Sequence, residues 1–223
     1  KLILMFTGIV EHQAEIVDIK KTKNNLDITL SCELTSEFKI DQSVSHNGIC
    51  LTVVSINNKS YTVTAIEETT NKTTIGCWMV GDIINLERAM KIGDRLDGHM
   101  IQGHIDQVGK CIYAEEKNGS WEFIIEYKKS NNNTVEKGSI AVNGISLTVI
   151  DSKTTQFKVA IIPYTYHNTS FKTLKKDDAV NLEFDILGKY LTKMALNYMC
   201  VCTYCFIGPC MQCYKLQHDH FGQ

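Results

Sequence analysis

No charge of one sign dominates this chain of 223 residues, because 23 Lys and Arg residues oppose 25 Asp and Glu residues and the net charge is -2. A nucleic-acid partner usually requires a basic face, so this class of function is excluded. No apolar run approaches the length of about 20 residues that a helix needs to cross a bilayer. The first six residues also lack the long apolar core and cleavage site of a signal peptide. We therefore expect no membrane partner and a cytosolic protein, or an organellar one after removal of a targeting segment.

The chain does contain a long internal repeat. A period of this length that occurs twice is too long for a solenoid unit and suits two whole domains of one fold. We expect these domains over residues 1–97 and 98–186, with the boundary in a charged stretch that carries glycine. Three pairs of segments carry the repeat: 43–53 with 139–149 and 85–87 with 181–183 at an offset of 96, and 5–11 with 100–106 at an offset of 95.

Positions at which the two copies differ are candidates for chemistry. Shared residues are expected to hold the fold, whereas differing residues can divide the labour between two pockets. A thiol, an imidazole and a carboxylate each occur in one copy only. The three differing pairs are Cys50 with Ser146, His104 with Ile9, and Asp185 with Ala89.

Each half is predicted to be a small antiparallel barrel of about six strands. Apolar residues alternate over short runs such as 60–64, which is the two-residue period of half-buried strands. Asn-Gly pairs supply the turns at hairpin spacing. Residues 67–74 and 164–170 can each form a helical turn with Thr or Asn as the N-cap. The charged residues 114–136 are predicted to form a solvated hairpin and loop.

A C-terminal helix is predicted over residues 187–199. Leu187, Tyr190, Leu191 and Met194 recur at nearly helical spacing. An amphipathic helix that follows two closed barrels has no obvious place within the chain to bury its apolar stripe. We therefore expect the helix to associate with copies of itself.

Residues 200–223 form a cysteine-rich tail. Chelation of zinc by four thiolates and disulfide cross-linking are two interpretations of this composition. We favour a third, a poorly ordered extension with no metal site, because the spacing between the two Cys-x-x-Cys pairs is short. The residues concerned are Cys200, Cys202, Cys205, Cys210, Cys213, His218 and His220.

Between residues 5 and 194, a series of motifs in one order resembles the riboflavin synthase family, which includes non-catalytic lumazine proteins. The resemblance implies two Greek-key barrels that bind lumazine, with no cofactor, and a homotrimer held by the C-terminal helix. It also implies active sites between barrels of neighbouring subunits, with lumazine synthase as a candidate partner. The motifs are MFTGIVE (5–11), SVSHNGICLTV (43–53), GHMIQGHID (98–106), KGSIAVNGISLTV (137–149), IPYT (162–165) and VNLEFD (180–185).

The activity that the resemblance implies is the dismutation of two molecules of 6,7-dimethyl-8-ribityllumazine, in which a four-carbon unit passes from one to the other. The products are riboflavin and 5-amino-6-ribitylaminouracil. Such a reaction needs two similar pockets that hold one compound in different roles, as a repeat with a few reactive differences provides. The alternative is a lumazine-binding or flavin-binding protein of the same fold without activity.

The resemblance assigns candidate catalytic roles to Ser43, Cys50 and His104, with Asp185 in support. His104 is the natural proton carrier. Cys50 is a candidate nucleophile on the condition that its pKa is lowered. A small apolar residue on a strand remains the alternative interpretation of Cys50, and a structural hydrogen bond that of His104.

The resemblance also implies a set of substrate-binding residues in both halves. Strand packing is the competing interpretation of Leu51, Leu147 and Ile162, and Thr52 and Thr148 could be ordinary strand threonines. The set consists of Gly8, Ile9, Val10, Cys50, Leu51, Thr52, Thr64, Ala65, Ile66, Glu67, Glu68, Thr69, Gly103, His104, Ile105, Lys137, Ser146, Leu147, Thr148, Ile161, Ile162, Pro163, Tyr164, Thr165 and Tyr166.

Overall fold

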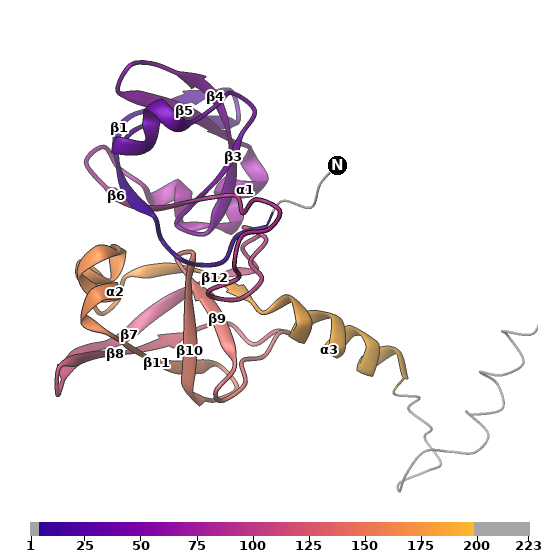
Figure 1. Cartoon of the computed structure of the whole chain (residues 1–223). Coiled ribbons are helices and arrows are strands. Elements are labelled where there is room, and N and C mark those ends of the chain that lie inside the picture. The colour runs from indigo at the N-terminus through magenta and orange to yellow at the C-terminus, as the bar shows by residue number, and fades with distance from the viewer. Residues whose placement is uncertain (1–4, 199–223) are drawn as a thin grey trace, which may run out of the picture.

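Both halves of the chain fold as closed antiparallel barrels of six strands in the computed structural model, which describes residues 5–198 (Figure 1). Read around the closed sheets, the strand orders β1-β2-β5-β4-β3-β6 and β7-β8-β11-β10-β9-β12 match. The predicted pair of barrels is therefore confirmed. The first barrel contains β1 (His12–Thr22), β2 (Asn25–Ser31), β3 (Ser43–His46), β4 (Ile49–Ile56), β5 (Ser60–Ala65) and β6 (Ile83–Arg88). The second contains β7 (Gln107–Lys117), β8 (Ser120–Glu126), β9 (Ser139–Val142), β10 (Ile145–Ser152), β11 (Gln156–Ile161) and β12 (Ala179–Phe184).

Alternation of side chains gives each barrel its own core. In β5, Tyr61, Val63 and Ala65 point inward and are buried, while the residues between them are partly exposed. β11 repeats this pattern. Bulges also recur at matching places, since the register shifts after Val53 in β4 and after Val149 in β10. The same local rules therefore build both barrels.

The segment 114–136 is a correction to the sequence-based prediction. The hairpin is present, with its turn at Asn118 and Gly119, but its second strand is not merely solvated. Phe123 and Ile125 of β8 are buried in the core of the second barrel. Phe123 and Ile125 share the inner face of the strand, while Glu122, Ile124 and Glu126 alternate with them on the other face. The high average polarity of the whole stretch therefore concealed a core strand.

A short helix follows β5 in the first barrel and β11 in the second. These helices, α1 (Glu67–Lys72) and α2 (Pro163–Asn168), start after Ile66 and Ile162, which provide no side-chain cap. The predicted threonine caps occur one element later, at the 3-10 helices η2 (Thr74–Cys77) and η3 (Ser170–Lys172). A further 3-10 helix, η1 (Glu33–Glu37), follows β2.

The motifs that the two halves share hold the barrels together. Asn85 Nδ2 donates hydrogen bonds to the backbone oxygen of Asn143 at 3.0 Å and to Ser170 Oγ at 2.9 Å. In the other half, Asn181 Nδ2 donates to the backbone oxygen of Asn47 at 2.9 Å. These asparagines are buried, and each half thereby satisfies polar groups in the turn of the other.

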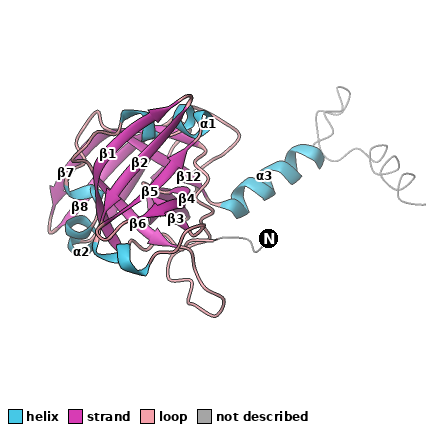
Figure 2. Cartoon of the chain, turned by 90° about the horizontal axis from the view of Figure 1, so that it is seen from above, coloured by secondary structure: helices cyan, strands magenta, loops and turns pink. Residues whose placement is uncertain are grey.

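The helix α3 (Ile186–Tyr198) extends away from both barrels (Figures 1 and 2). Leu187, Tyr190, Leu191 and Met194 are more than half exposed, so the barrels of the same chain do not cover the apolar stripe of the helix. No helix within residues 5–198 is long and apolar enough to span a membrane. The zinc, disulfide and disorder interpretations of the cysteine-rich tail concern residues outside the described range.

Candidate functional site

The segment that leads into each barrel crosses to the other barrel. The backbone oxygen of Gly8 accepts a hydrogen bond from Ser146 N in the second barrel, and that of Gly103 accepts one from Cys50 N in the first, both at 2.9 Å. Val10 accordingly contacts the core of the second barrel, and Ile105 that of the first. At each crossing, a strand of one barrel therefore meets a segment that continues into the first strand of the other barrel.

Glycine is required where these segments cross. Gly8 and Gly103 have φ values of 81° and 76°, a region that side chains rarely adopt. A Cβ atom on Gly103 would also lie 2.5 Å from the Cβ of Cys50, and one on Gly8 would lie 2.6 Å from that of Ser146. The two predicted glycines thus allow the backbone to approach the divergent residues of the repeat.

The first-barrel pocket is an open cavity of about 290 Å³. Six of its lining residues were predicted from the sequence, and the pocket brings Cys50 and His104 together. The sequence-based prediction missed Ile49, Lys72 and Thr73. Lys72 could have been found, because it forms an ion pair at 2.7 Å with the predicted residue Glu68, and the i, i+4 spacing of this pair is visible in the sequence. The lining consists of Ile49, Cys50, Glu68, Thr69, Lys72, Thr73, Gly103, His104 and Ile105.

Cys50 does not meet the condition set for a nucleophile. Burial raises the pKa of its thiol, and the carboxylate of Glu183 raises it further, while a hydrogen bond with Ser43 lowers it. Burial is the largest of these effects, so the thiol form is favoured at neutral pH. His104, by contrast, is exposed, and its backbone N–H donates to Glu183 Oε2 at 2.9 Å.

Ser43 also lines a second and larger cleft of about 640 Å³ next to this pocket. Arg88 lies in the same cleft and bonds Glu11 at 2.6 Å and Glu37 at 2.7 Å, so its charge is already paired. Ile9 contributes an apolar wall that is 47% exposed. Ser43 therefore lines this cleft, while its hydroxyl is hydrogen-bonded to the thiol of Cys50 in the smaller pocket.

Asp185 lies apart from the other three candidate catalytic residues. Its Oδ1 accepts a hydrogen bond from Leu187 N at 3.0 Å at the start of α3. Its charge also acts on His99, which donates to or accepts from Ser146 Oγ through Nδ1 at 2.7 Å. Burial lowers the pKa of His99. The structure thus assembles Asp185, His99 and Ser146 beside the second barrel.

His99 is a site residue that sequence reasoning missed. Its Nε2 is the one buried side-chain nitrogen or oxygen atom within residues 5–198 that has no hydrogen-bond partner. The sequence did contain a signal, since His99 stands in the same motif as His104. Without the fold, nothing indicated that these two histidines would lie next to different barrels.

The remaining second-barrel candidates occupy the mouth of that barrel. Ile162 and Tyr164 are 62% and 76% exposed, and Pro163 and Lys137 are also exposed. Tyr166 is stacked on Trp121, with ring centroids 3.9 Å apart and planes 5° from parallel. Large apolar side chains at this mouth therefore lack cover within one chain.

Some predicted binding residues do not point outward. The side chains of Leu51, Ala65, Leu147 and Ile161 lie in the barrel cores, so only their backbone groups could reach a ligand. This follows from the two-residue period, because each alternates with an outward-facing neighbour. Their outward-facing or polar neighbours in the predicted set are Thr52, Thr64, Ile66, Glu67, Thr148 and Thr165.

The sequence and the fold resemble those of known proteins. A family model described as the lumazine binding domain matches residues 7–89 and 102–185. The chain is 36% identical to the riboflavin synthase of Actinobacillus pleuropneumoniae over 195 residues, which cover 86% of this chain and 91% of that one. It is 34% identical to the riboflavin synthase of Bacillus subtilis over 189 residues, or 84% and 88% of the two chains.

Solved structures share the fold. The crystal structure of LumP complexed with riboflavin superposes with a TM-score of 0.75 at 24% identity and covers 81% of this chain and 99% of that chain. The fold and the family match therefore define a class of proteins with two tandem lumazine-binding barrels. Together with the identity to its curated relatives, this places the chain in the riboflavin synthase family.

Proposed function

We propose that the protein converts two molecules of 6,7-dimethyl-8-ribityllumazine into riboflavin and 5-amino-6-ribitylaminouracil. Membership of the riboflavin synthase family supports this activity. The observation that carries it is the pair of related crossings, in which Gly103 meets Cys50 in one barrel and Gly8 meets Ser146 in the other, so that different reactive residues stand at matching places. The two products together contain all the atoms of the two substrates, so the transfer needs no external oxidant.

In this proposal His104 transfers protons and Cys50 acts as a neutral thiol. The donor lumazine must lose a proton from a ring methyl group, and an exposed imidazole at the pocket edge is suited to receive it. The raised pKa of Cys50 favours a thiol that donates a hydrogen bond over a thiolate that adds to the acceptor. Ser43 orients that thiol.

A second site, where Gly8 meets Ser146, would hold the other lumazine molecule, with Ser146 and Asp185 as its polar groups. Exposed apolar residues at the N-terminal ends of α1 and α2, such as Ile66 and Tyr164, support closure of both sites by a neighbouring subunit. The exposed stripe of α3 supports a homotrimer built around that helix. Binding without turnover is less well supported, because Cys50 and His104 share one cavity.

The test is the appearance of riboflavin absorbance when purified protein receives the lumazine without metal, nucleotide or oxygen. His104→Gln should lower kcat by roughly 100-fold or more, the usual contribution of a proton-transferring group. Cys50→Ser, which keeps a small hydrogen-bond donor, should lose less. A wild-type protein that binds the lumazine but forms no product over hours would instead be a carrier.

A further inference from the structure

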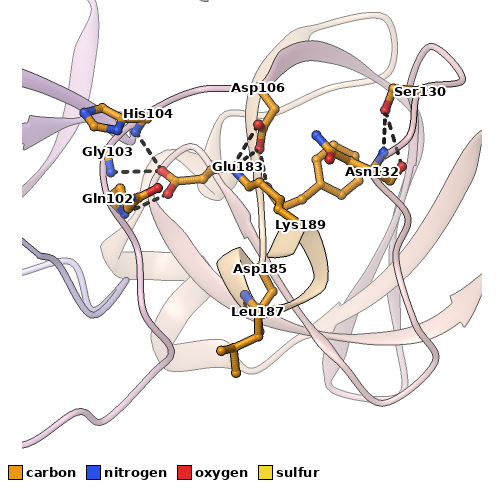
Figure 3. A network of polar contacts seen from close by, with 11 residues as sticks. Gln102, Gly103, His104, Asp106, Ser130, Asn132, Glu183, Asp185, Leu187 and Lys189 are labelled. Carbon is orange, nitrogen blue, oxygen red and sulfur yellow. Dashed lines mark hydrogen bonds and ion pairs between the residues drawn. The ribbon is translucent and has the colours of Figure 1, made fainter. Parts of the chain in front are cut away.

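We propose that Glu183, a residue of the second barrel, is a positioning residue for His104 and Cys50 in the first-barrel pocket. The inference rests on the proposed function, because it gives Glu183 a role in that reaction. Figure 3 shows the arrangement, in which the carboxylate faces the backbone of residues 102–104 while the ring of His104 points away from it.

The carboxylate binds three consecutive backbone N–H groups. Oε1 accepts from Gln102 N at 2.7 Å, and Oε2 accepts from Gly103 N and His104 N, both at 2.9 Å. The oxygen of Gly103 in turn accepts from Cys50 N at 2.9 Å. These bonds fix the backbone of His104 and the contact between Gly103 and Cys50. They therefore set the backbone positions from which the side chains of His104 and Cys50 extend.

A second carboxylate fixes the other end of the same segment. Asp106 Oδ2 accepts from Phe184 N at 2.8 Å, and the Asp106 carboxylate forms an ion pair with Lys189 Nζ at 2.7 Å. Lys189 belongs to α3 and Phe184 to β12, on which Glu183 also lies. The segment from Gln102 to Asp106 is therefore held at both ends by β12 and the base of α3.

The chemistry of this site requires a carboxylate. Every group that faces Glu183 from the segment is a donor, so the segment is held best by the ionised form, in which both oxygens accept. This form prevails above neutral pH, because the pKa of Glu183 is raised to about 7. A glutamine at this position would place an amide N–H against one or two backbone N–H groups and leave them without an acceptor. Such a change shifts the segment that brings Gly103, His104 and Ile105 to the pocket, and a displacement of about 1 Å can reduce turnover roughly 100-fold.

The repeat supplies a matched control. Glu87 binds Thr7 N at 2.6 Å, Thr7 Oγ1 at 2.8 Å and Gly8 N at 2.9 Å in the first half. It is 5% exposed, against 2% for Glu183. The segment that it holds carries Ile9 where the other carries His104. Loss of either carboxylate should therefore cost comparable stability, but only the loss of Glu183 moves the imidazole of His104.

The experiment compares Glu183→Gln with Glu87→Gln in the full chain. For Glu183→Gln we expect kcat to fall by roughly 10- to 100-fold while the dissociation constant for riboflavin changes by less than about threefold. For Glu87→Gln, which disturbs the binding residues Gly8 and Ile9, we expect mainly a raised KM. Glu183→Asp, which keeps the charge but is one methylene shorter, should act like Glu183→Gln and serves if the amide variant does not fold.

A second measurement does not depend on activity. Alkylation of Cys50 by iodoacetamide, mapped by mass spectrometry, should become at least about fivefold faster in both Glu183→Gln and Glu183→Asp, because Gly103 no longer packs closely on Cys50. The aspartate keeps the negative charge that raises the pKa of the thiol, so its rate reports the shift of the segment and not the loss of charge. Glu87→Gln should leave this rate near that of the wild type. If both glutamine variants lose kcat equally and alkylate equally, Glu183 is only structural. If the wild type has no activity but the alkylation rates differ, the proposed function fails while the role of Glu183 in holding the segment stands.

Discussion

Glu87 and Glu183 hold the two crossing segments, and they should make the free energy of unfolding depend on pH in the direction opposite to that of an ordinary salt-bridged carboxylate. Burial raises the pKa of Glu183 from 4.5 to about 7, and the bonds from Gln102 and His104, together with Lys189, lower it only in part. Glu87 is likewise raised to about 7, with burial as the main cause. The folded state therefore binds protons more tightly than the unfolded state at both sites.

The sign of the effect follows from this difference. Between pH 4.5 and 7 the folded protein holds a proton on each glutamate that the unfolded chain has released, so stability falls as the pH rises through this window. The full difference corresponds to roughly 3 kcal/mol per glutamate as an upper limit. From about pH 5 to about pH 8, roughly 2 kcal/mol per site should be observed.

Urea denaturation of the wild type and Glu183→Gln at these two pH values measures the effect. Glutamine does not titrate, so the difference between the two free energies of unfolding isolates Glu183 from all other carboxylates. The variant should be destabilised by roughly 2 kcal/mol more at pH 5 than at pH 8. A destabilisation that instead grows with pH would show that the three N–H bonds outweigh burial, and would refute our reasoning about this site.

Two further predictions follow from the arrangement of the barrels and of α3. Removal of residues 187–223 should convert the proposed trimer into monomers, which light scattering measures. These monomers should still bind riboflavin but turn over poorly. A chain that ends at Tyr198 is the control, and an unchanged trimer mass would show that α3 does not hold the trimer. Asn85→Ala should lower the free energy of unfolding by about 2–4 kcal/mol, because it leaves buried groups of Asn143 and Ser170 without partners; a loss below about 1 kcal/mol in urea denaturation would mean that these bonds do not hold the barrels together.

Much of the architecture was predictable because it depends on local patterns that occur twice. Alternation of apolar residues and the Asn-Gly turns specify strands and hairpins, and the repeat shows that one solution is used in both halves. The exception was β8, a short apolar strand within a stretch whose other residues are mostly charged or polar. A prediction from average polarity fails for a strand that has one solvent-exposed face and one buried face.

The candidate site was only partly predictable. The juxtaposition of Cys50 and His104 was anticipated from the family resemblance, and the structure places both in one cavity. The separation of Asp185 from them, and its position beside His99, could not be inferred from spacing along the chain. Nor could the raised pKa of Cys50, because it arises mainly from burial by residues distant in sequence.

Sequence alone specified two copies of one barrel and the few positions at which they differ, since these are properties of residue order. Only the tertiary structure decided next to which barrel each divergent residue lies. The segments before β1 and β7 cross between the barrels, so Gly8 meets Ser146 and Gly103 meets Cys50. That exchange depends on contacts between residues roughly 50 to 140 positions apart, which no local pattern encodes.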